Sequence, residues 1–127
     1  MINKINKLFP QNFPHRGEIY KFNFNPTRGK EIRDIHPGLV ISINEQNEHG
    51  HYLIVAPITS TLKKVRLFEV FINADEKTGL QKPSKILLNQ IRSIDKKSRI
   101  TEYLGKVDEE TIQKVNSGLD LVLGLEK

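Results

Sequence analysis

The sequence contains no cysteine and no tryptophan, and it has a single methionine. The lack of cysteine excludes disulfide bonds, thiol catalysis and zinc sites with cysteine ligands. The chain has no run of 18 apolar residues, so we expect no transmembrane helix and no membrane partner. Polar and apolar residues alternate near the N-terminus, where a secretory signal would need a continuous apolar stretch. We therefore expect a cytoplasmic protein.

The charge of the chain is unevenly distributed. The 127 residues, a length that favours one domain, carry a formal charge of +5 with a pI near 9.5. Residues 108–127 hold five acidic residues and two lysines, a net charge of −3, so residues 1–107 carry +8. A basic body of this kind favours a polyanionic partner such as nucleic acid or an acidic protein tail. The alternative interpretation is that the charge only keeps the protein soluble.

Short strands are predicted along most of the chain. In GEIYKFNF (17–24) the side chains alternate with a period of two, which is typical of a strand. The other expected strands are rich in apolar and β-branched residues: 38–44, 52–59, 66–72, 84–95 and 100–107. Pro57 predicts an edge position or a strand end for its segment. Glycine, proline and polar residues indicate connections between the strands: a long loop at 25–37, a turn at 45–51 and a loop at 73–83.

The period changes near the C-terminus. Apolar residues recur there at intervals of three and four: Ile112, Val115, Leu119, Val122 and Leu123. Asp108 is a plausible N-cap with acidic residues behind it, so residues 108–124 are predicted to form a helix. Residues 1–14 hold two prolines and three asparagines and are expected to be a flexible extension before a domain at 15–127. The sequence therefore predicts a mainly β fold with a C-terminal helix, arranged as a small, partly open β-barrel.

Several segments, in this order, resemble one family, the MazF/PemK toxins of bacterial type II toxin–antitoxin systems. The matching segments span nearly the whole chain: RGEIY (16–20), GKEIRDIHPGLVIS (29–42), IVAPITS (54–60), ILLNQIRSIDK (86–96) and the helix end LGL (123–125). The resemblance implies an SH3-like (MazF/CcdB-like) barrel, a homodimer, and an endoribonuclease that cuts single-stranded RNA without metal or other cofactor. It also implies a cognate antitoxin with an acidic segment, and operator DNA as a partner of the toxin–antitoxin complex only.

One position departs from the family pattern. The family usually has arginine before the proline of the loop–strand junction, and that arginine is assigned to catalysis, whereas this chain has His36. The family threonine that closes the VAPIT strand is present as Thr59. The resemblance therefore implies His36 and Thr59 as the catalytic pair.

The chemistry of this pair suits RNA cleavage by the ribose 2′-hydroxyl. An imidazole titrates near neutral pH and can move a proton, which arginine does not readily do because it stays protonated. The threonine hydroxyl can donate a hydrogen bond to a phosphate oxygen. Cationic and amide side chains are candidates for RNA binding: Arg28, Lys30, Arg33, Lys63, Lys64, Asn89 and Gln90. Three aromatic residues are candidates for base stacking or for the core: Tyr20, Phe22 and Phe24.

Each candidate also has a purely structural interpretation. His36 can be a surface histidine at a strand end, Thr59 an ordinary strand threonine, and the loop arginines solvated charges. His49 and His51 could suggest a metal site, but two ligands in a turn favour a polar turn and no metal. Asn89 and Gln90 could read base edges or satisfy backbone groups of the barrel. Arg92 is expected to pair with Asp95 or Glu102 and brace the fold.

Two functions from different classes follow. The first is a ribonuclease toxin, and the second is a non-catalytic module that binds nucleic acid or an antitoxin, as gyrase-poisoning relatives on the same fold suggest. A repressor role is expected only through the complex with the antitoxin, because the sequence has no helix-turn-helix signal.

Overall fold

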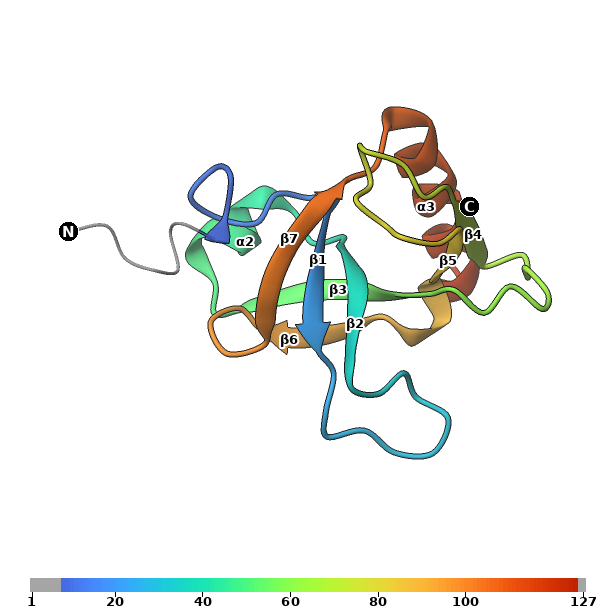
Figure 1. Cartoon of the computed structure of the whole chain (residues 1–127), viewed down its shortest axis with the longest axis horizontal. Helices are drawn as coiled ribbons and strands as arrows, with labels where there is room; N and C mark the ends of the chain where they lie inside the picture. Colours follow the sequence, from blue (N-terminus) through green and yellow to red (C-terminus); the bar gives the residue numbers. More distant parts are fainter. Residues whose placement is uncertain (1–7, 126–127) are drawn as a thin grey trace.

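The structure is a computed structural model and describes residues 8–125. Its elements follow in chain order: β1 (Glu18–Asn23), β2 (Ile35–Val40), α2 (Asn44–His49), β3 (Tyr52–Thr59), β4 (Glu69–Ile72), β5 (Ser84–Leu87), the 3-10 turn η1 (Leu88–Gln90), β6 (Arg92–Asp95), β7 (Ile100–Lys106) and α3 (Glu109–Leu123). The strands pair in the order β4-β5-β3-β2-β1-β7, with β6 also on β3, and every pairing is antiparallel. The sheet curls so that β1, β2 and β7 run across β3 and β6 (Figure 1). The predicted mainly β, partly open barrel with a C-terminal helix is confirmed.

Strand β3 is the centre of this arrangement because it has three partner strands. One side pairs with β2, ending at Gly38↔Pro57. The other side pairs first with β6, up to Val55↔Arg92, and then with β5, from Ile58 onwards. Pro57 lies in the interval between the two partners, where its missing N–H removes no ladder hydrogen bond. The expected edge position of Pro57 is therefore wrong, and its place close to the end of β3 fits the other alternative.

Strand β1 is buried on both faces and separates two apolar clusters. Ile19 belongs to the cluster under α3. Tyr20 and Phe22 belong to the cluster on the opposite face, which we call the aromatic cluster. Strand β3 divides in the same way, because Leu53 and Val55 face the aromatic cluster while Ala56 and Ile58 belong to the cluster under α3. Each strand thus contributes to two cores, which gives a short chain enough buried apolar area to fold without crosslinks.

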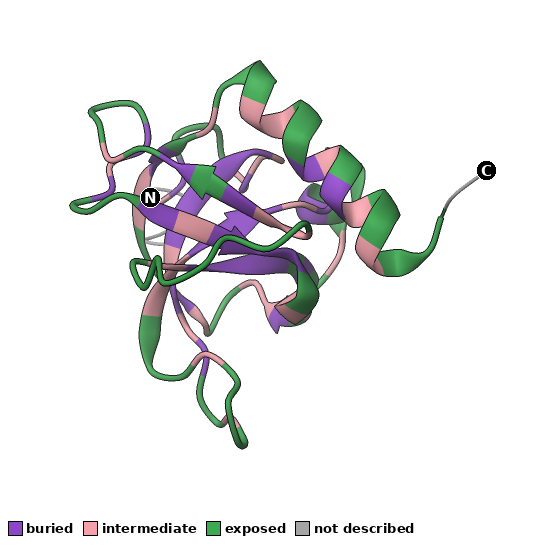
Figure 2. Ribbon diagram, turned by 90° about the vertical axis from the view of Figure 1, so that its right-hand side faces the viewer, coloured by how far each residue is buried: buried purple, intermediate pink, exposed green. Residues whose placement is uncertain are grey.

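Helix α3 closes one of the two clusters. Asp108 is its N-cap and accepts a hydrogen bond from the Thr111 amide at 2.8 Å, and Gly124 ends it in the left-handed conformation at φ 67°. Val115 and Gly118 face the sheet, while the outer side of the helix is exposed (Figure 2). The predicted helix is confirmed. No helix among residues 8–125 is long and apolar enough to cross a membrane.

The strand expected at 38–44 is observed as β2, which begins at Ile35 inside the segment predicted as a loop. Two further elements differ in kind from the sequence prediction. The single strand expected at 84–95 is broken into β5, η1 and β6, because Leu88 leaves the sheet to pack against Gly118 of α3. The turn expected at 45–51 contains helix α2, whose Asn47 is fully buried and hydrogen-bonded to Ser42. The Lys96 ammonium donates to the carbonyl of Asn47 at 2.7 Å, at the C-terminal end of this helix. Both differences arise from tertiary contacts.

The N-terminal segment is partly packed. Phe9 is buried in the aromatic cluster, with its ring centroid 5.8 Å from that of Tyr20 in an edge-to-face arrangement. The expectation of a flexible extension therefore does not hold at Phe9. For residues 1–7 it lies outside the described part of the chain.

The β4–β5 loop (73–83) is docked on β7 through backbone atoms. The Lys106 amide donates to the Lys77 carbonyl at 2.9 Å. A Cβ atom on Gly79 would overlap the carbonyl of Leu104, and one on Gly105 would overlap the carbonyl of Lys77. Only glycine fits at these contacts, so the loop is held close to the strand.

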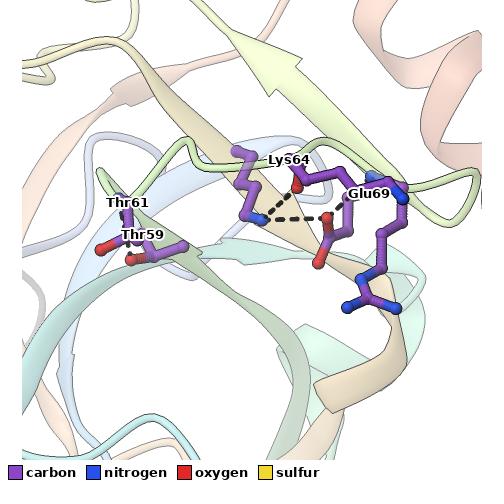
Figure 3. Close-up of polar contacts among 6 residues, drawn as sticks. Thr59, Thr61, Lys64 and Glu69 are labelled. Atoms are coloured by element: carbon purple, nitrogen blue, oxygen red, sulfur yellow. Dashed lines mark hydrogen bonds and ion pairs between the residues drawn. The ribbon is translucent and has the colours of Figure 1, made fainter.

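The β3–β4 loop (60–68) is fastened by one ion pair. The Lys85 ammonium donates to the Lys64 carbonyl at 2.7 Å and to the Glu69 carboxylate at 3.0 Å (Figure 3). The same carboxylate accepts the Arg66 amide at 2.9 Å. Only 12% of the Lys85 side chain and 7% of the Glu69 side chain are exposed. Burial raises the pKa of Glu69, but the hydrogen bonds from Arg66 and Lys85 outweigh it and leave that pKa below its ordinary value.

We expect Gly105→Ala to destabilise the protein by about 1–3 kcal/mol, because the new methyl group meets backbone that can move only with the whole loop. Urea denaturation measures the loss. Lys106→Ala, at the next and exposed residue, is the control and is expected to change stability by no more than about 0.5 kcal/mol. Equal stabilities of the two variants would contradict the docking contact.

We expect Lys85→Met to speed tryptic cleavage within residues 60–68, because the loop loses both bonds from the ammonium. Lys77→Met, in the other loop, is the control and should leave that rate unchanged.

The Lys85–Glu69 pair makes the stability of the folded protein depend on pH. Because the pKa of Glu69 is lowered, the pair stabilises the fold fully above the ordinary glutamate pKa, and this stabilisation is lost as the pH falls through the lowered pKa. The NMR shift of the Arg66 amide should therefore titrate below pH 4.3, roughly the ordinary glutamate value. A midpoint at or above that value would contradict the pairing.

Candidate functional site

The β1–β2 loop and η1 enclose a cavity of about 470 Å³, which we call the loop cavity. Its walls carry cationic, acidic, amide and apolar groups: Phe24, Pro26, Arg28, Glu31, Ile32, Pro57, Asn89, Gln90, Ile91 and Arg92. Three of the predicted RNA-binding residues, Arg28, Asn89 and Gln90, therefore lie together. Asn89 is exposed and Gln90 is half-buried.

Hydrogen bonds hold the β1–β2 loop over this cavity. The Gln90 side-chain oxygen accepts the Ile32 amide at 2.9 Å, which links the loop to η1. At the base of the loop, Asn25 and Asp34 exchange two hydrogen bonds, each 3.0 Å long. Gln90 thus satisfies a backbone group, as one of the two interpretations expected, and it also lines the cavity.

Arg92 is part of the cavity wall. Its guanidinium donates to the Phe24 carbonyl at 2.8 Å and lies 5.9 Å from the centre of the Phe24 ring. The ion pair expected with Asp95 or Glu102 is not formed, and that prediction is wrong. Arg92 stands opposite Val55 at the end of the β3–β6 ladder, which brings its side chain to Phe24 in the cavity wall.

The candidate catalytic residues His36 and Thr59 stand on neighbouring strands. The ladder between β2 and β3 ends at Gly38↔Pro57, and continuing this register by two residues along each strand leads to His36 and Thr59. By alternation both residues fall on the sheet face that carries Pro57. His36 and Thr59 are half-buried, and the Thr59 hydroxyl accepts the Thr61 amide at 3.2 Å (Figure 3).

His36 also borders a second cavity, of about 300 Å³, which we call the strand cavity. This cavity lies between the β7-β1-β2 part of the sheet and the β4–β5 loop. It has apolar and polar walls: Lys21, His36, Pro37, Ile58, Ser60, Gly79, Leu80, Gln81, Lys82, Ser84, Glu102 and Leu104. His36 lines the strand cavity and is absent from the walls of the loop cavity. Gly38, two residues further along β2, lies against the rings of Phe22 and Phe24.

The other predicted cations are on loops outside both cavities. Lys30 and Arg33 are exposed in the β1–β2 loop, where the Arg33 guanidinium donates to the Gly29 carbonyl at 2.9 Å. Lys63 and Lys64 are exposed in the β3–β4 loop that Lys85 fastens. Within residues 8–125, no three potential metal-ligating side chains are grouped closely enough to hold a metal ion.

The aromatic residues proposed for stacking are core residues. Tyr20, Phe22 and Phe24 are fully buried, and of the three only Phe24 borders the loop cavity. Burial, with a hydrogen bond of 2.8 Å to Glu18, raises the pKa of Tyr20 far above its ordinary value. The core interpretation of these three residues is confirmed.

Sequence reasoning missed several residues around the two cavities. The sequence indicates only a bracing role for Arg92, and it marks none of the strand-cavity residues Lys21, Gln81 and Glu102 as part of a site. The alternation of 17–24 places Lys21 on a definite face, but only the pairing of β1 with β7 brings it to Glu102. No local pattern brings Gln81, in a loop, to the same place.

Comparisons with known proteins agree with this architecture. The family model described as PemK-like, MazF-like toxin of type II toxin–antitoxin system matches residues 15–123. The chain is 36% identical over 111 residues to Endoribonuclease EndoA of Bacillus subtilis, covering 87% of this chain and 94% of the relative. It is 34% identical over 110 residues to Endoribonuclease MazF of Staphylococcus saprophyticus, covering 87% and 91%.

Solved structures show the same fold. MazF from Deinococcus radiodurans superposes with a TM-score of 0.77 at 28% identity, covering 88% of this chain and 97% of that one. A mycobacterial endoribonuclease in complex with its cognate antitoxin has a TM-score of 0.74 at 24% identity, covering 90% and 98%. Family match, identity and fold thus lead to one conclusion: this chain belongs to the PemK-like, MazF-like toxin family of type II toxin–antitoxin systems.

Proposed function

We propose that this protein is a toxin that cleaves single-stranded RNA by attack of the ribose 2′-hydroxyl, without a metal ion. The observation that carries the proposal is the register of β2 and β3, which leads to His36 and Thr59 on one face of the sheet. The relatives named endoribonuclease, at 34% and 36% identity over most of the chain, support this reaction class.

The reaction requires two proton transfers and stabilisation of the crowded phosphorus. The 2′-oxygen bonds to phosphorus, the bond to the 5′-oxygen breaks, and a 2′,3′-cyclic phosphate remains on the 5′ fragment. The His36 imidazole moves a proton, either from the 2′-hydroxyl or to the departing 5′-oxygen. The Thr59 hydroxyl, which already accepts the Thr61 amide, is left with its own proton to donate to a non-bridging phosphate oxygen.

The RNA strand then continues on both sides of the scissile phosphate. Arg28 and Arg92 supply positive charge in the loop cavity, and the exposed amide of Asn89 can hydrogen-bond a base edge there. The loop cations Lys30, Arg33, Lys63 and Lys64 attract the phosphate backbone electrostatically.

Basic loops at this site also fit the second partner expected of the family. An antitoxin with an acidic, extended segment would compete with RNA for the same cations. The mycobacterial endoribonuclease that shares this fold is in complex with its cognate antitoxin. We place the protein in the cytoplasm, where mRNA is available, with operator DNA bound only by the toxin–antitoxin complex.

We also propose a homodimer, with the face between β4 and α3 as its interface. Large apolar side chains are exposed there, with Leu67 86%, Phe71 47% and Leu121 44% accessible. They border a groove of about 560 Å³ formed by these two elements. Exposed apolar groups gathered on one face are typical of an interface between subunits, and a second copy presents the same groups.

We expect His36→Ala to reduce RNA cleavage by roughly a hundredfold or more, because a proton-transfer group is lost. Cleavage of an unstructured RNA is followed in EDTA, with His51→Ala as the control, since His51 is exposed and lies at the other end of β3.

The wild type should cut in EDTA, and a 2′-deoxy nucleotide immediately 5′ of the cut should block the reaction. Cleavage of that deoxy substrate would contradict internal attack, and tight RNA binding without cleavage by the wild type would favour the non-catalytic module.

We expect Phe71→Asp to convert the dimer to monomers, because a carboxylate would be buried in the apolar interface. Sedimentation velocity measures the mass. Tyr52→Asp provides the matched control, as Tyr52 is an exposed aromatic residue on β3 that takes no part in the groove. Dimers of unchanged stability in Phe71→Asp would place the interface elsewhere.

A further inference from the structure

We infer that the strand cavity is a base-recognition pocket for the nucleotide next to the scissile phosphate, selecting a base with an exocyclic amino group. The inference rests on the proposed function, because it takes His36 as the marker of the scissile position. It assigns a ligand class and a selecting residue, Glu102, to a cavity that the reaction itself does not require.

The size and position of the strand cavity suit a single nucleobase. The cavity volume of about 300 Å³ is at the lower end of the range for small-molecule pockets, which suits a single ring system. His36 forms part of its wall. A ribose whose phosphate lies against His36 can therefore place its own base in this cavity without a further nucleotide between them.

The walls of the strand cavity combine an apolar floor with a polar rim. Ile58 is 1% exposed and Leu80 is 8% exposed, so the floor is apolar core surface on which a planar base can lie. The rim carries both donors and acceptors, from Gln81, Lys82 and Glu102. An apolar floor with a mixed polar rim matches a nucleobase, which has apolar faces and a polar edge.

The charges of the strand cavity favour an amino group over a phosphate at Glu102. Lys21 and Lys82 both line the cavity, and the Lys21 ammonium lies 3.6 Å from the Glu102 carboxylate, which partly neutralises it. A second anion would meet the repulsion of this carboxylate. The carboxylate is instead an acceptor for amino groups, and glutamate is a known reader of the cytosine N4 amino group. Uracil presents a carbonyl oxygen at that position and would face the carboxylate unfavourably.

The backbone that carries the polar side chains of the strand cavity is held rigidly, as selectivity between bases requires. The wall that carries Gln81 and Lys82 continues directly from Gly79, whose backbone contact with Leu104 holds the loop on β7. Ser84 is 5% exposed and donates to the Lys82 carbonyl at 2.8 Å, which fastens the other side of the same wall. The polar groups are thus presented from a supported backbone, a condition for discriminating between bases.

The test compares wild type with Glu102→Gln, which keeps the size of the side chain and replaces an acceptor by a donor. Cut sites are mapped by sequencing across a randomised RNA library. We expect the wild type to disfavour uracil at one position adjacent to the cut, and Glu102→Gln to change that preference by roughly tenfold while other positions stay the same. Glu76→Gln, in the same loop region but outside the cavity, is the charge-matched control and should retain the wild-type pattern.

A change in overall rate with an unchanged base preference would overturn the inference. A second measurement separates this failure from a failure of the proposed function. Cytidine and uridine 5′-monophosphate are titrated by NMR into the wild type and into Glu102→Gln. We expect larger shifts with the cytidine nucleotide at Gln81 and Lys82 in the wild type, and equal shifts in the variant. If the wild type cleaves no RNA, the proposed function is refuted. If the wild type shows equal NMR shifts with the two nucleotides, the base-recognition pocket is refuted.

Discussion

The exchange of partner strands along β3 is the constraint on which the rest of the structure depends. Val55 is paired with β6 and Ile58 with β5, and the chain that joins these two partners must leave the sheet between them. This departure forms η1, which carries Asn89 and Gln90 beside Pro57 and opens the loop cavity. The same interval tolerates a proline and ends the β2–β3 ladder just before His36 and Thr59. A continuous ladder on both sides of β3 would leave no room for the site.

The family resemblance implies an arginine where this chain has His36, and the two side chains offer different chemistry. A guanidinium supplies permanent charge, whereas an imidazole supplies a proton acceptor or donor and a charge that depends on pH. The surrounding cations can compensate for the lost charge, because Arg28 and Arg92 lie in the adjoining loop cavity. The reaction we propose is therefore divided among separate groups, with proton transfer at His36 and charge supplied by its neighbours.

Local sequence patterns predicted an element correctly where one period of side chains runs through the whole element. The alternation of 17–24 corresponds to β1, and the capped three-and-four repeat corresponds to α3. The prediction of one strand at 84–95 was wrong because its apolar residues serve two cores, and Leu88 turns away to contact Gly118. For the site, the sequence offers Arg28, Asn89 and Gln90 only as separate candidates for RNA binding, and the fold brings them to one cavity. Their role in RNA binding stays a prediction. It could not find Lys21, Gln81 and Glu102 as one group, because three separate elements meet there only in the folded sheet.

The glycine contacts between the β4–β5 loop and β7 have an evolutionary consequence. Gly79 and Gly105 fix the backbone of the loop through atoms that are independent of the side chains at 81 and 82. Mutations at those two surface positions can therefore accumulate without disturbing the framework that presents them. A lineage could therefore change its RNA target motif in small steps while the catalytic strands remain unchanged. The fixed backbone of the β4–β5 loop is what permits the side chains at 81 and 82 to vary.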